Sequence, residues 1–301
     1  MELVITLIAH QNGKAPLTQA LVDTMATTLS AQGIPVKKHA WLAEGVACDL
    51  FTTHSNDDAM DARVRAVLGM QPVDVVVQPA AERRKQMLIS DMDSTMITVE
   101  CIDELADFVG KKAHVAAITE RAMNGELDFE AALTERVALL AGLSEEVLEQ
   151  AYNDRVKIMA GARELVATMA KNGAYCVLVS GGFTFFTQRV ADELGFHENH
   201  ANRLEIEDGK LTGRVIPPIL GKEAKLDSLK NICAIKRIPR ESSLAVGDGA
   251  NDLPMLQAAG LGVAYHAKPV VISQARARIS HSNLRALLYV QGYSDADIIA
   301  A

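Results

Sequence analysis

Two aspartates separated by a single residue, Asp91 and Asp93, follow the short apolar run 87–89. A run of this length bounded by polar residues is typical of a buried parallel strand. Carboxylates at the end of such a strand lie where open α/β sheets bind their ligands. If Asp91 continues the strand, both side chains start on the same side of the chain, because side-chain direction repeats every two residues. Two carboxylates held this close repel each other, and a hard divalent cation such as Mg²⁺ would relieve that repulsion.

Two further groups of polar residues occupy comparable places along the chain. Ser180, Gly181 and Gly182 directly follow the predicted buried strand 175–179. Small residues at a strand-to-helix turn let backbone N–H groups approach an anion, and the N-terminus of the next helix adds a favourable dipole. A simple tight turn is the alternative interpretation. Lys225 lies at the start of a predicted helix, and a lone lysine in such a place is usually solvated.

The segment 247–252, with the sequence Gly-Asp-Gly-Ala-Asn-Asp, follows the predicted strand 243–246. Two acids and an amide among glycines at the end of a strand could hold a metal ion, because hard cations prefer oxygen ligands. The same residues could also form only a turn in which Asn251 or Asp252 caps the following helix. The segment by itself leaves both interpretations open.

The composition is that of a globular protein with one large or two smaller domains. The 301 residues are 49% hydrophobic and 23% charged, with a formal net charge of -8 and a pI near 5.5. We expect no nucleic-acid partner, because no basic stripe is visible. We expect no membrane span and no signal peptide, because long apolar runs and a basic N-terminal region are both missing. Widely separated cysteines predict neither a disulfide framework nor a zinc site and fit a reducing cytoplasm; they are Cys48, Cys101, Cys176 and Cys233.

Residues 1–80 alternate the hydrophobic periods of strands and helices in the order βαββαβ. This order predicts a ferredoxin-like fold, and it also resembles the ACT-type domains that bind amino acids in metabolic enzymes. Serine as a feedback ligand and the pairing of two chains into a homodimer are both left open by the sequence. A packing or assembly domain without a ligand is the alternative. The predicted elements are strands 3–9, 36–42, 46–53 and 73–78 and helices 17–31 and 59–68.

The polar segment 79–85, Pro-Ala-Ala-Glu-Arg-Arg-Lys, is the best candidate for a domain boundary, and its charges are interpreted as a solvated run. Residues 81–301 would then form a second domain. Its region from about 100 to 160 has the periodicity of short helices without strands, which predicts a helical bundle inserted as a lid. Strands and helices alternate after this bundle, which predicts a mostly parallel, doubly wound α/β sheet.

The combined motifs resemble the haloacid dehalogenase (HAD) superfamily of phosphatases. The shared order is acid-x-acid, Ser, Lys and Gly-Asp-Gly-x-Asn-Asp, each group in its own strand-to-helix setting. The stretches 91–100 and 127–137 resemble the opening motif and the helical cap of members that act on phosphoserine. The stretches 179–183 and 246–252 match the remaining motifs, and the resemblance covers about residues 85–290. It implies a HAD-type sheet with an inserted cap and the Mg²⁺-dependent hydrolysis of phosphoserine, the last step of serine biosynthesis.

The resemblance assigns the chemistry to a group of aspartates. It implies that Asp91 is the nucleophile and forms an aspartyl-phosphate. Asp93 would protonate the leaving oxygen and then take a proton from the hydrolytic water. The metal would be held by Asp91, the backbone carbonyl of Asp93 and Asp248, and Asp252 would support these ligands.

The resemblance also implies how the phosphoryl group is held. Ser180, the Gly181 amide and Lys225 would contact its oxygens and offset the charge that develops during transfer. Lys225 thereby counts among the catalytic residues as well as the binding residues. Asn251 would either bind the phosphate or position Lys225.

Four further residues follow from the resemblance as contacts to the rest of the substrate. A carboxylate at Glu100 suits the ammonium group of phosphoserine, and Arg136 can form two hydrogen bonds with its carboxylate. Met123 and Phe129 would line the cap against the small carbon skeleton. Without the resemblance, Arg136 would be interpreted as an exposed arginine on an amphipathic helix.

Three other functions remain open at this stage. The substrate could be another small phosphorylated amino alcohol or phosphohomoserine, since the same core motifs serve both. The same core also supports phosphoryl transfer to an alcohol in place of water. An amino-acid-binding regulatory module is a different class of protein, and it predicts the loss of an essential acid. Phosphate release with Mg²⁺ distinguishes an enzyme from such a module.

Overall fold

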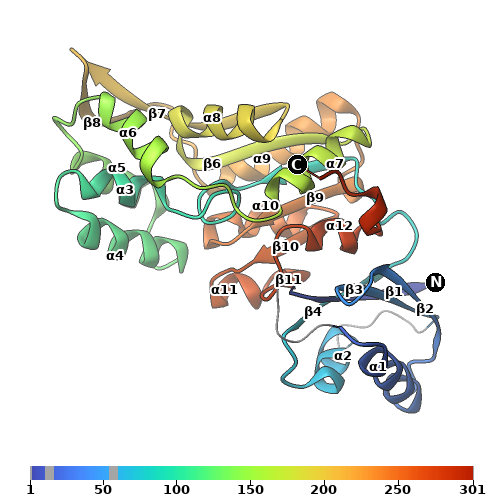
Figure 1. Cartoon of the computed structure of the whole chain (residues 1–301). Coiled ribbons are helices and arrows are strands. Elements are labelled where there is room, and N and C mark those ends of the chain that lie inside the picture. The colour runs from blue at the N-terminus through green and yellow to red at the C-terminus, as the bar shows by residue number, and fades with distance from the viewer. Residues whose placement is uncertain (1, 11–16, 54–59, 301) are drawn as a thin grey trace.

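The computed structural model describes residues 2–10, 17–53 and 60–300, and two β-sheets organise this part of the chain (Figure 1). A four-stranded sheet is formed by the N-terminal residues, and a seven-stranded sheet is formed by the rest. A group of helices projects from one end of the larger sheet (Figure 1). None of the helices in the described ranges combines the length and the apolar character that a membrane crossing requires.

The smaller sheet carries two helices on one face (Figure 1). Its elements are β1 Leu3–Ala9, α1 Gln19–Ala31, β2 Val36–Ala43, β3 Ala47–Thr52, α2 Met60–Leu68 and β4 Val73–Pro79. The strand order is β2-β3-β1-β4, and all neighbouring strands are antiparallel. This confirms the predicted βαββαβ order and the ferredoxin-like fold. Residue 59, the predicted start of the second helix, lies outside the described residues.

Helix α1 shows how local sequence sets these elements. Thr18 is its N-cap, and the Thr18 hydroxyl accepts a hydrogen bond of 3.2 Å from the backbone N–H of Leu21. The buried side chains Val22, Met25 and Leu29 recur at helical spacing and pack in one apolar cluster with strand β1. One face of the helix is therefore fixed to the sheet.

The larger sheet contains the strand that precedes the two predicted catalytic aspartates. Its strands are β5 Met87–Ser90, β6 Tyr175–Phe183, β7 Glu198–Glu207, β8 Lys210–Ile216, β9 Ser243–Gly247, β10 Leu261–Tyr265 and β11 Ala277–Ile279. The order is β11-β10-β9-β5-β6-β7-β8, and every pair is parallel except β7 with β8. Strand β5 is central, so the residues that follow β5, β6 and β9 meet at one edge of the sheet.

Helices cover both faces of the larger sheet, as the doubly wound prediction requires. These helices are α7 Ala162–Lys171, α8 Thr184–Leu194, α9 Lys222–Lys236, α10 Leu253–Ala258, α11 Pro269–Ile272 and α12 Ala286–Val290. Leu88 of β5 packs in an apolar cluster with residues of α7, α8 and α12. Its neighbours Met87 and Ile89 pack in a second cluster with residues of α9, α10 and α11. Because strand side chains alternate in direction, β5 contributes to an apolar core on each face of the sheet.

The helical cap is inserted between β5 and α7, at the predicted place. Its helices are α3 Cys101–Asp107, α4 Lys112–Met123, α5 Phe129–Ala138 and α6 Glu146–Arg155. Backbone hydrogen bonds close the insertion where it leaves and re-enters the core, from Met159 N–H to the Met96 carbonyl (2.9 Å) and from Thr98 N–H to the Lys157 carbonyl (3.0 Å). The cap is therefore anchored directly beside the two aspartates.

Several elements of the larger sheet were not predicted correctly. The β-prone stretches 203–207 and 210–215 predict only a hairpin, which the antiparallel pair of β7 and β8 confirms, but β7 already begins at Glu198 and pairs in parallel with β6. Its polar start, Glu198-Asn199-His200, hides the strand because it lacks an apolar run. The short elements α11, β11 and α12 were also missed. Helix α9 begins at Lys222, so Lys225 lies almost one turn inside the helix and not at its start.

The charges of the predicted boundary segment are solvated only in part, because Glu82 and Arg84 are exposed whereas Arg83 is largely buried. Arg83 Nη2 lies 2.6 Å from Oδ2 of the buried carboxylate of Asp49 in β3. The guanidinium of Arg84 lies 4.2 Å from the ring centroid of Tyr293. Lys85 Nζ donates to the carbonyl of Glu241 at 2.8 Å. These contacts fix the segment to strand β3 on one side and, on the other, to residues near β9 and α12 in the part of the chain that forms the larger sheet.

A second contact between the sheets involves the buried carboxylate of Asp74 in β4. It accepts hydrogen bonds of 2.7 to 3.2 Å from the backbone N–H groups of Ser280, His281 and Ser282, which follow β11. Three backbone donors therefore share one carboxylate as their acceptor. A buried carboxylate with several donors is satisfied without a cation, so we interpret Asp74 as a structural residue.

Candidate active site

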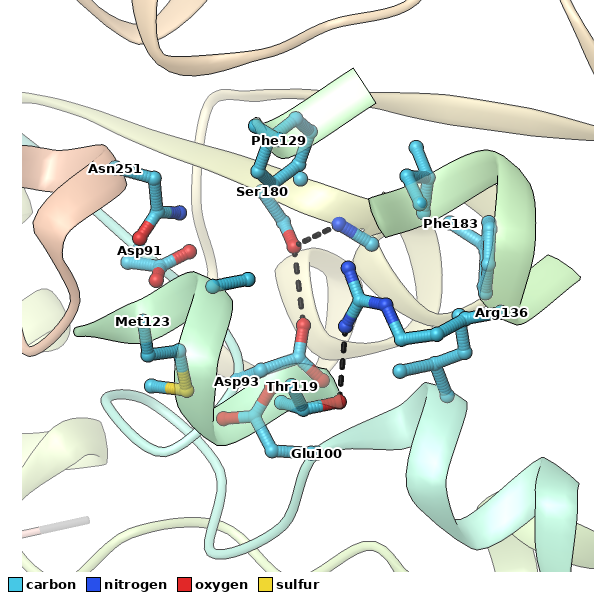
Figure 2. A pocket seen from close by; sticks show the side chains of 15 residues that line it. Asp91, Asp93, Glu100, Thr119, Met123, Phe129, Arg136, Ser180, Phe183 and Asn251 are labelled. Atoms are coloured by element: carbon cyan, nitrogen blue, oxygen red, sulfur yellow. Dashed lines mark hydrogen bonds between the residues drawn. The ribbon is translucent and has the colours of Figure 1, made fainter. Parts of the chain in front are cut away.

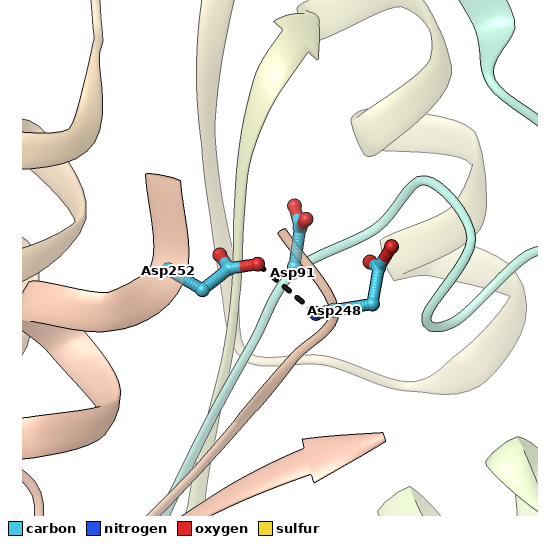
Figure 3. A group of neighbouring side chains, drawn as sticks. All are labelled: Asp91, Asp248 and Asp252. Atoms are coloured by element: carbon cyan, nitrogen blue, oxygen red, sulfur yellow. Dashed lines mark hydrogen bonds between the residues drawn. The ribbon is translucent and has the colours of Figure 1, made fainter. Parts of the chain in front are cut away.

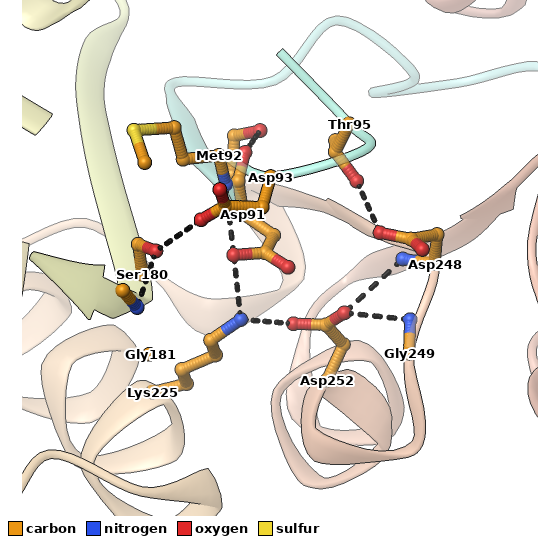
Figure 4. A network of polar contacts seen from close by, with 12 residues as sticks. Asp91, Met92, Asp93, Thr95, Ser180, Gly181, Lys225, Asp248, Gly249 and Asp252 are labelled. Atoms are coloured by element: carbon orange, nitrogen blue, oxygen red, sulfur yellow. Dashed lines mark hydrogen bonds and ion pairs between the residues drawn. The ribbon is translucent and has the colours of Figure 1, made fainter. Parts of the chain in front are cut away.

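The predicted catalytic residues converge where β5, β6 and β9 end, and a buried lysine lies among them (Figure 4). Lys225 Nζ lies 2.7 Å from Asp91 Oδ1 and 2.6 Å from Asp252 Oδ1. Burial alone would lower the pKa of Lys225, but the charges of Asp252 and Asp91 raise it above its ordinary value. The lysine is therefore a permanent cation beside the predicted nucleophile.

Asp252 fixes the shape of the loop after β9. Its Oδ1 accepts from Lys225, while its Oδ2 accepts from the backbone N–H groups of Asp248 (3.1 Å) and Gly249 (3.0 Å). Gly247 is required here, because a Cβ at that position would lie 2.4 Å from the Asp252 carboxyl group. Both oxygens of Asp252 are thus used to hold the loop and the lysine, which explains the Gly-Asp-Gly-x-Asn-Asp spacing.

Three carboxylates could hold a metal ion (Figure 3): oxygen atoms of Asp91, Asp248 and Asp252 lie within 4.8 Å of one another. Asp91 Oδ1 accepts from Met92 N–H (2.8 Å) and Lys225, and Asp248 Oδ1 accepts from the Thr95 hydroxyl (2.9 Å). Among the described residues, the other oxygen of Asp91 and of Asp248 has no hydrogen-bond donor. These two oxygens are the ligands that the cluster offers, and oxygen ligands suit a hard divalent cation.

The site carries more negative charge than its lysine can balance. Burial and the charge of Asp252 raise the pKa of Asp91 to about 7. Burial and the charge of Asp91 raise the pKa of Asp248 well above its ordinary value. Burial also raises the pKa of Asp93. A bound divalent cation would stabilise the ionised forms of these acids, so the residues present fit a metal site.

Asp93 points away from this cluster toward the pocket (Figure 4). Its Oδ1 accepts from Cys101 N–H (2.8 Å) and its Oδ2 from the Ser180 hydroxyl (3.1 Å). The Ser180 hydroxyl in turn accepts from Gly182 N–H at 2.8 Å. A carboxyl group with a raised pKa at the wall of a pocket is suited to proton transfer. Metal binding by the Asp93 backbone carbonyl stays a prediction.

The pocket lies between the cap and the carboxyl ends of β5 and β6 (Figure 2). All the predicted substrate-binding residues except Lys225 line it, and Lys225 lies beside it against Asp91. Ile102, Thr119 and Leu133 are lining residues that were not predicted. The lining consists of Asp91, Asp93, Glu100, Ile102, Thr119, Ala122, Met123, Phe129, Leu133, Arg136, Ser180, Gly181, Gly182, Phe183 and Asn251.

Phe129 of the cap packs directly on the core. A Cβ at Gly181 would lie 2.5 Å from the Phe129 ring, and one at Gly221 would lie 3.3 Å from it. The ring therefore occupies space that any larger residue at Gly181 would fill. This contact brings the cap over the end of the pocket formed by Ser180 and Gly181 and explains why a glycine follows Ser180.

Two opposite charges of the cap region face the pocket without pairing with each other. Arg136 is buried, which contradicts the alternative of an exposed helix residue. Its Nε donates to the Ala132 carbonyl (3.0 Å) and its Nη1 to the Thr119 hydroxyl (2.9 Å). No carboxylate of the described residues lies within 4.0 Å of its guanidinium. Glu100 accepts from the Ser94 hydroxyl at 2.5 Å, and burial followed by the charge of Asp93 raises its pKa well above its ordinary value.

Comparison with known families identifies this arrangement. The family model of haloacid dehalogenase-like hydrolases matches residues 88–257. A solved structure described as a phospho-aspartyl intermediate analogue of phosphoserine phosphatase is similar with a TM-score of 0.66 and 39% identity, over 68% of this chain and 98% of that chain. The chain belongs to the haloacid dehalogenase-like hydrolases.

Curated relatives define the group within that family. The phosphoserine phosphatase of Saccharomyces cerevisiae is 35% identical over 303 residues, which cover 99% of this chain and 98% of the yeast protein. The phosphoserine phosphatase of Polaromonas sp. is 45% identical over 232 residues, which cover 73% of this chain and 98% of that protein. The similarity to the yeast protein extends over both sheets.

Proposed function

We propose that this chain is a phosphoserine phosphatase, which hydrolyses O-phosphoserine to serine and phosphate as the last step of serine biosynthesis. One observation carries the proposal: Glu100 and the buried Arg136 present opposite charges to a pocket that also contains Asp91 and Asp93. Phosphoserine carries an ammonium, a carboxylate and a phosphate, and the pocket has a complementary group for each. The names of the curated relatives support the same activity.

The acid pair supports a two-step transfer. Asp91 attacks phosphorus and forms an aspartyl-phosphate, while the bond from phosphorus to the serine oxygen breaks. Asp93 gives its proton to the leaving serine oxygen, which its raised pKa favours. In the second step Asp93 takes a proton from water, which attacks phosphorus and releases phosphate from Asp91. The solved relative with an intermediate analogue supports the covalent step for that protein.

The phosphoryl oxygens would be held by groups around Asp91. The Ser180 hydroxyl and the Gly181 amide lie at the end of β6, and Asn251 approaches from the loop after β9. Lys225 supplies a positive charge at the attacking carboxylate. Such donors, fixed before the reaction begins, stabilise the charge that develops in transfer without reorganising.

Mg²⁺ is the metal that we propose for the carboxylate cluster. Asp91, Asp248 and the backbone carbonyl of Asp93 would hold it, and Asp252 would fix the loop that presents Asp248. When bound, the ion supplies charge neutralisation between the nucleophile and the phosphate. The excess of buried carboxylates over cations in the site supports this assignment.

Residues of the cap region would select the substrate. Glu100 would contact the ammonium group, and Arg136 would form two hydrogen bonds with the carboxylate. Met123 and Phe129 would enclose the carbon skeleton between these charges. An ester that lacks one of the two charges would leave Glu100 or Arg136 enclosed without a partner, which is costly.

The test is phosphate release from a panel of small esters with Mg²⁺ and with EDTA. The panel contains phosphoserine, phosphohomoserine, phosphoethanolamine and phosphoglycolate. We expect Mg²⁺-dependent turnover with a strong preference for phosphoserine. Preference for phosphohomoserine or another amino alcohol would retain the aspartate mechanism and overturn the substrate assignment. Phosphoryl transfer to an added alcohol in place of water would define a phosphotransferase.

We also propose that residues 1–80, which include the N-terminal sheet and its two helices, form an ACT-like domain. Serine as a feedback ligand and pairing of two chains stay open questions for these residues. The division at residue 80 and a cytoplasmic location likewise stay predictions from the sequence. Each can be tested separately from the phosphatase activity.

A further inference from the structure

Arg136 is held in the pocket wall by two contacts on different helices, and Figure 2 shows the one with Thr119. Its Nε is bonded to its own helix α5 through the Ala132 carbonyl, and its Nη1 is bonded to Thr119 of α4. Thr119 is in turn bonded to Asp103 of α3, with 2.7 Å between Thr119 Oγ1 and Asp103 Oδ1. We propose that Thr119 and Asp103 are positioning residues that set selectivity for substrates with a carboxylate. This inference rests on the proposed role of Arg136 in phosphoserine binding.

The direction of the hydrogen bonds follows from the single proton of the Thr119 hydroxyl. That oxygen lies 2.7 Å from the Asp103 carboxylate and 3.1 Å from the Val115 carbonyl. The shorter contact to a charged acceptor takes the proton, because charge-assisted hydrogen bonds are stronger. A lone pair of Oγ1 is then left to accept from Arg136 Nη1 at 2.9 Å. Asp103 therefore sets the direction of the hydroxyl that Arg136 uses.

The Thr119 hydroxyl also keeps the charges of Asp103 and Arg136 apart. A direct pair between Asp103 and Arg136 would neutralise the guanidinium and turn its hydrogen-bonding edge away from the pocket. With Thr119 between them, Asp103 lies close enough to stabilise the buried cation without pairing with it. Burial lowers the pKa of Arg136, and the charges of Glu100 and then of Asp103 oppose that lowering. Among the described residues, Arg136 Nη2 has no acceptor. That nitrogen is left for a carboxylate in the pocket.

The three members come from three successive cap helices, α3, α4 and α5. Thr119 and Arg136 are both buried, while Asp103 is half-buried at the outer end of the chain of contacts. The position of the guanidinium thus depends on the packing of all three helices. A correctly placed Arg136 requires the assembled cap, so carboxylate recognition is tied to cap structure.

The decisive variant is Thr119→Val, which keeps the shape and removes the hydroxyl. We expect the KM for phosphoserine to rise about tenfold, the usual effect of losing one hydrogen bond to a charged group. The kcat for phosphoserine, and both constants for phosphoethanolamine, should change less than about twofold, because that ester has no carboxylate for Arg136. Thr119→Ser should restore the KM, and Asp103→Ala should raise it in the same selective way. Thr134→Val is the matched control, since Thr134 is exposed and its hydroxyl donates to the Glu130 carbonyl of its own helix (2.8 Å).

The outcomes separate this inference from the proposed function. A wild-type enzyme that turns over phosphoserine and a Thr119→Val variant with an unchanged KM would refute the positioning role alone. Equal rises in KM for phosphoserine and phosphoethanolamine, without rescue by Thr119→Ser, would mean a merely structural role and would also refute it. A wild-type enzyme without preference for phosphoserine over phosphoethanolamine would overturn the proposed function and this inference together. Circular dichroism melts of each variant identify any loss of folding. If Thr119→Val does not fold, Asp103→Ala keeps the test decisive, because it removes the carboxylate that directs the hydroxyl and leaves the pocket lining unchanged.

Discussion

The floor of the pocket, by which we mean Asp91, Asp248, Asp252 and Lys225, and the cap arrange their charged side chains in opposite ways. In the floor, Lys225 contacts Asp91 and Asp252 at ion-pair distance, and both oxygens of Asp252 have donors. In the cap region, Glu100 and Arg136 are kept apart, and within the described part of the chain they bond to hydroxyl and carbonyl groups alone. The floor is a connected network, whereas the cap presents separate charges.

This difference matches two chemical tasks. A transferring phosphoryl group needs several donors and cations fixed in advance, since its charge is spread over its oxygens. Recognition of a zwitterion instead needs two charges that remain available until the ligand arrives. Changes in the floor should therefore affect turnover of every ester, and changes in the cap should affect esters according to the groups they carry.

The largest effect is expected in the floor, from Asp91→Asn. Turnover of all esters should fall by about 10⁴-fold or more, because the nucleophile is lost while shape is retained. Initial rates of phosphate release measure this, with mass spectrometry to exclude deamidation and circular dichroism to verify the fold. If the variant, verified to be free of deamidation, released phosphate at the wild-type rate, Asp91 would have no part in the mechanism.

A smaller and selective effect is expected in the cap, from Arg136→Ala and Glu100→Gln. Arg136→Ala should raise the KM for phosphoserine and phosphoglycolate about 100-fold and spare phosphoethanolamine, since an unpaired buried carboxylate costs about 2 to 5 kcal/mol. Glu100→Gln should instead raise the KM for phosphoserine and phosphoethanolamine and spare phosphoglycolate. Steady-state kinetics with the three esters measure both patterns. Equal effects on all three would show that the cap does not separate the two charges.

The smallest effect concerns the stability of the floor without metal. Burial raises the pKa of Asp91 from about 3.8 to about 7, so the folded chain binds this proton more tightly than the unfolded chain. The free energy of unfolding should then fall as pH rises through this range, by roughly 2 kcal/mol, given about 1.4 kcal/mol per pKa unit and partial relaxation of the site. Mg²⁺ should therefore stabilise the protein more at pH 7 than at pH 4.

Urea unfolding with EDTA and with Mg²⁺ at both pH values measures this difference. The comparison with and without metal isolates the site, because other titrating groups contribute equally to both. Asp248→Asn serves as the control, since it removes a proposed ligand and should reduce the Mg²⁺ effect. Equal stabilisation at the two pH values would contradict the proposal that the cation relieves repulsion among ionised carboxylates.

Much of the fold was predictable because periodicity and strand ends carry strong signals. The six elements of the N-terminal sheet agree with the predictions to within about two residues in the described ranges. The hairpin of β7 with β8 was predicted, but the first part of β7 could not be found, because residues 198–200 are polar and pair with β6. The burial of Arg83 in the segment 79–85 was missed for a similar reason, since its buried partner Asp49 lies in another sheet.

The residues of the candidate site likewise divide into those that the sequence predicts and those that it does not. Asp91 and Asp248 follow strands and Ser180 lies near the end of β6, so their convergence follows from a parallel sheet. Asp103 and Thr119 carry no such signal, because they lie on helices with ordinary amphipathic sequences. Their importance comes only from the way the cap helices pack around Arg136.

The carboxylate of Asp74 has a consequence for how such chains gain or lose their N-terminal sheet. It is the shared acceptor for the backbone N–H groups of Ser280, His281 and Ser282. Covering this turn with a sheet that lacks the carboxylate would leave the buried Ser282 donor without this acceptor, which costs about 1 to 3 kcal/mol. Recombination of the sheet with another partner therefore requires a replacement acceptor at this turn. The boundary between the N-terminal sheet and the rest of the chain is thus set by the need for this acceptor as well as by the linker.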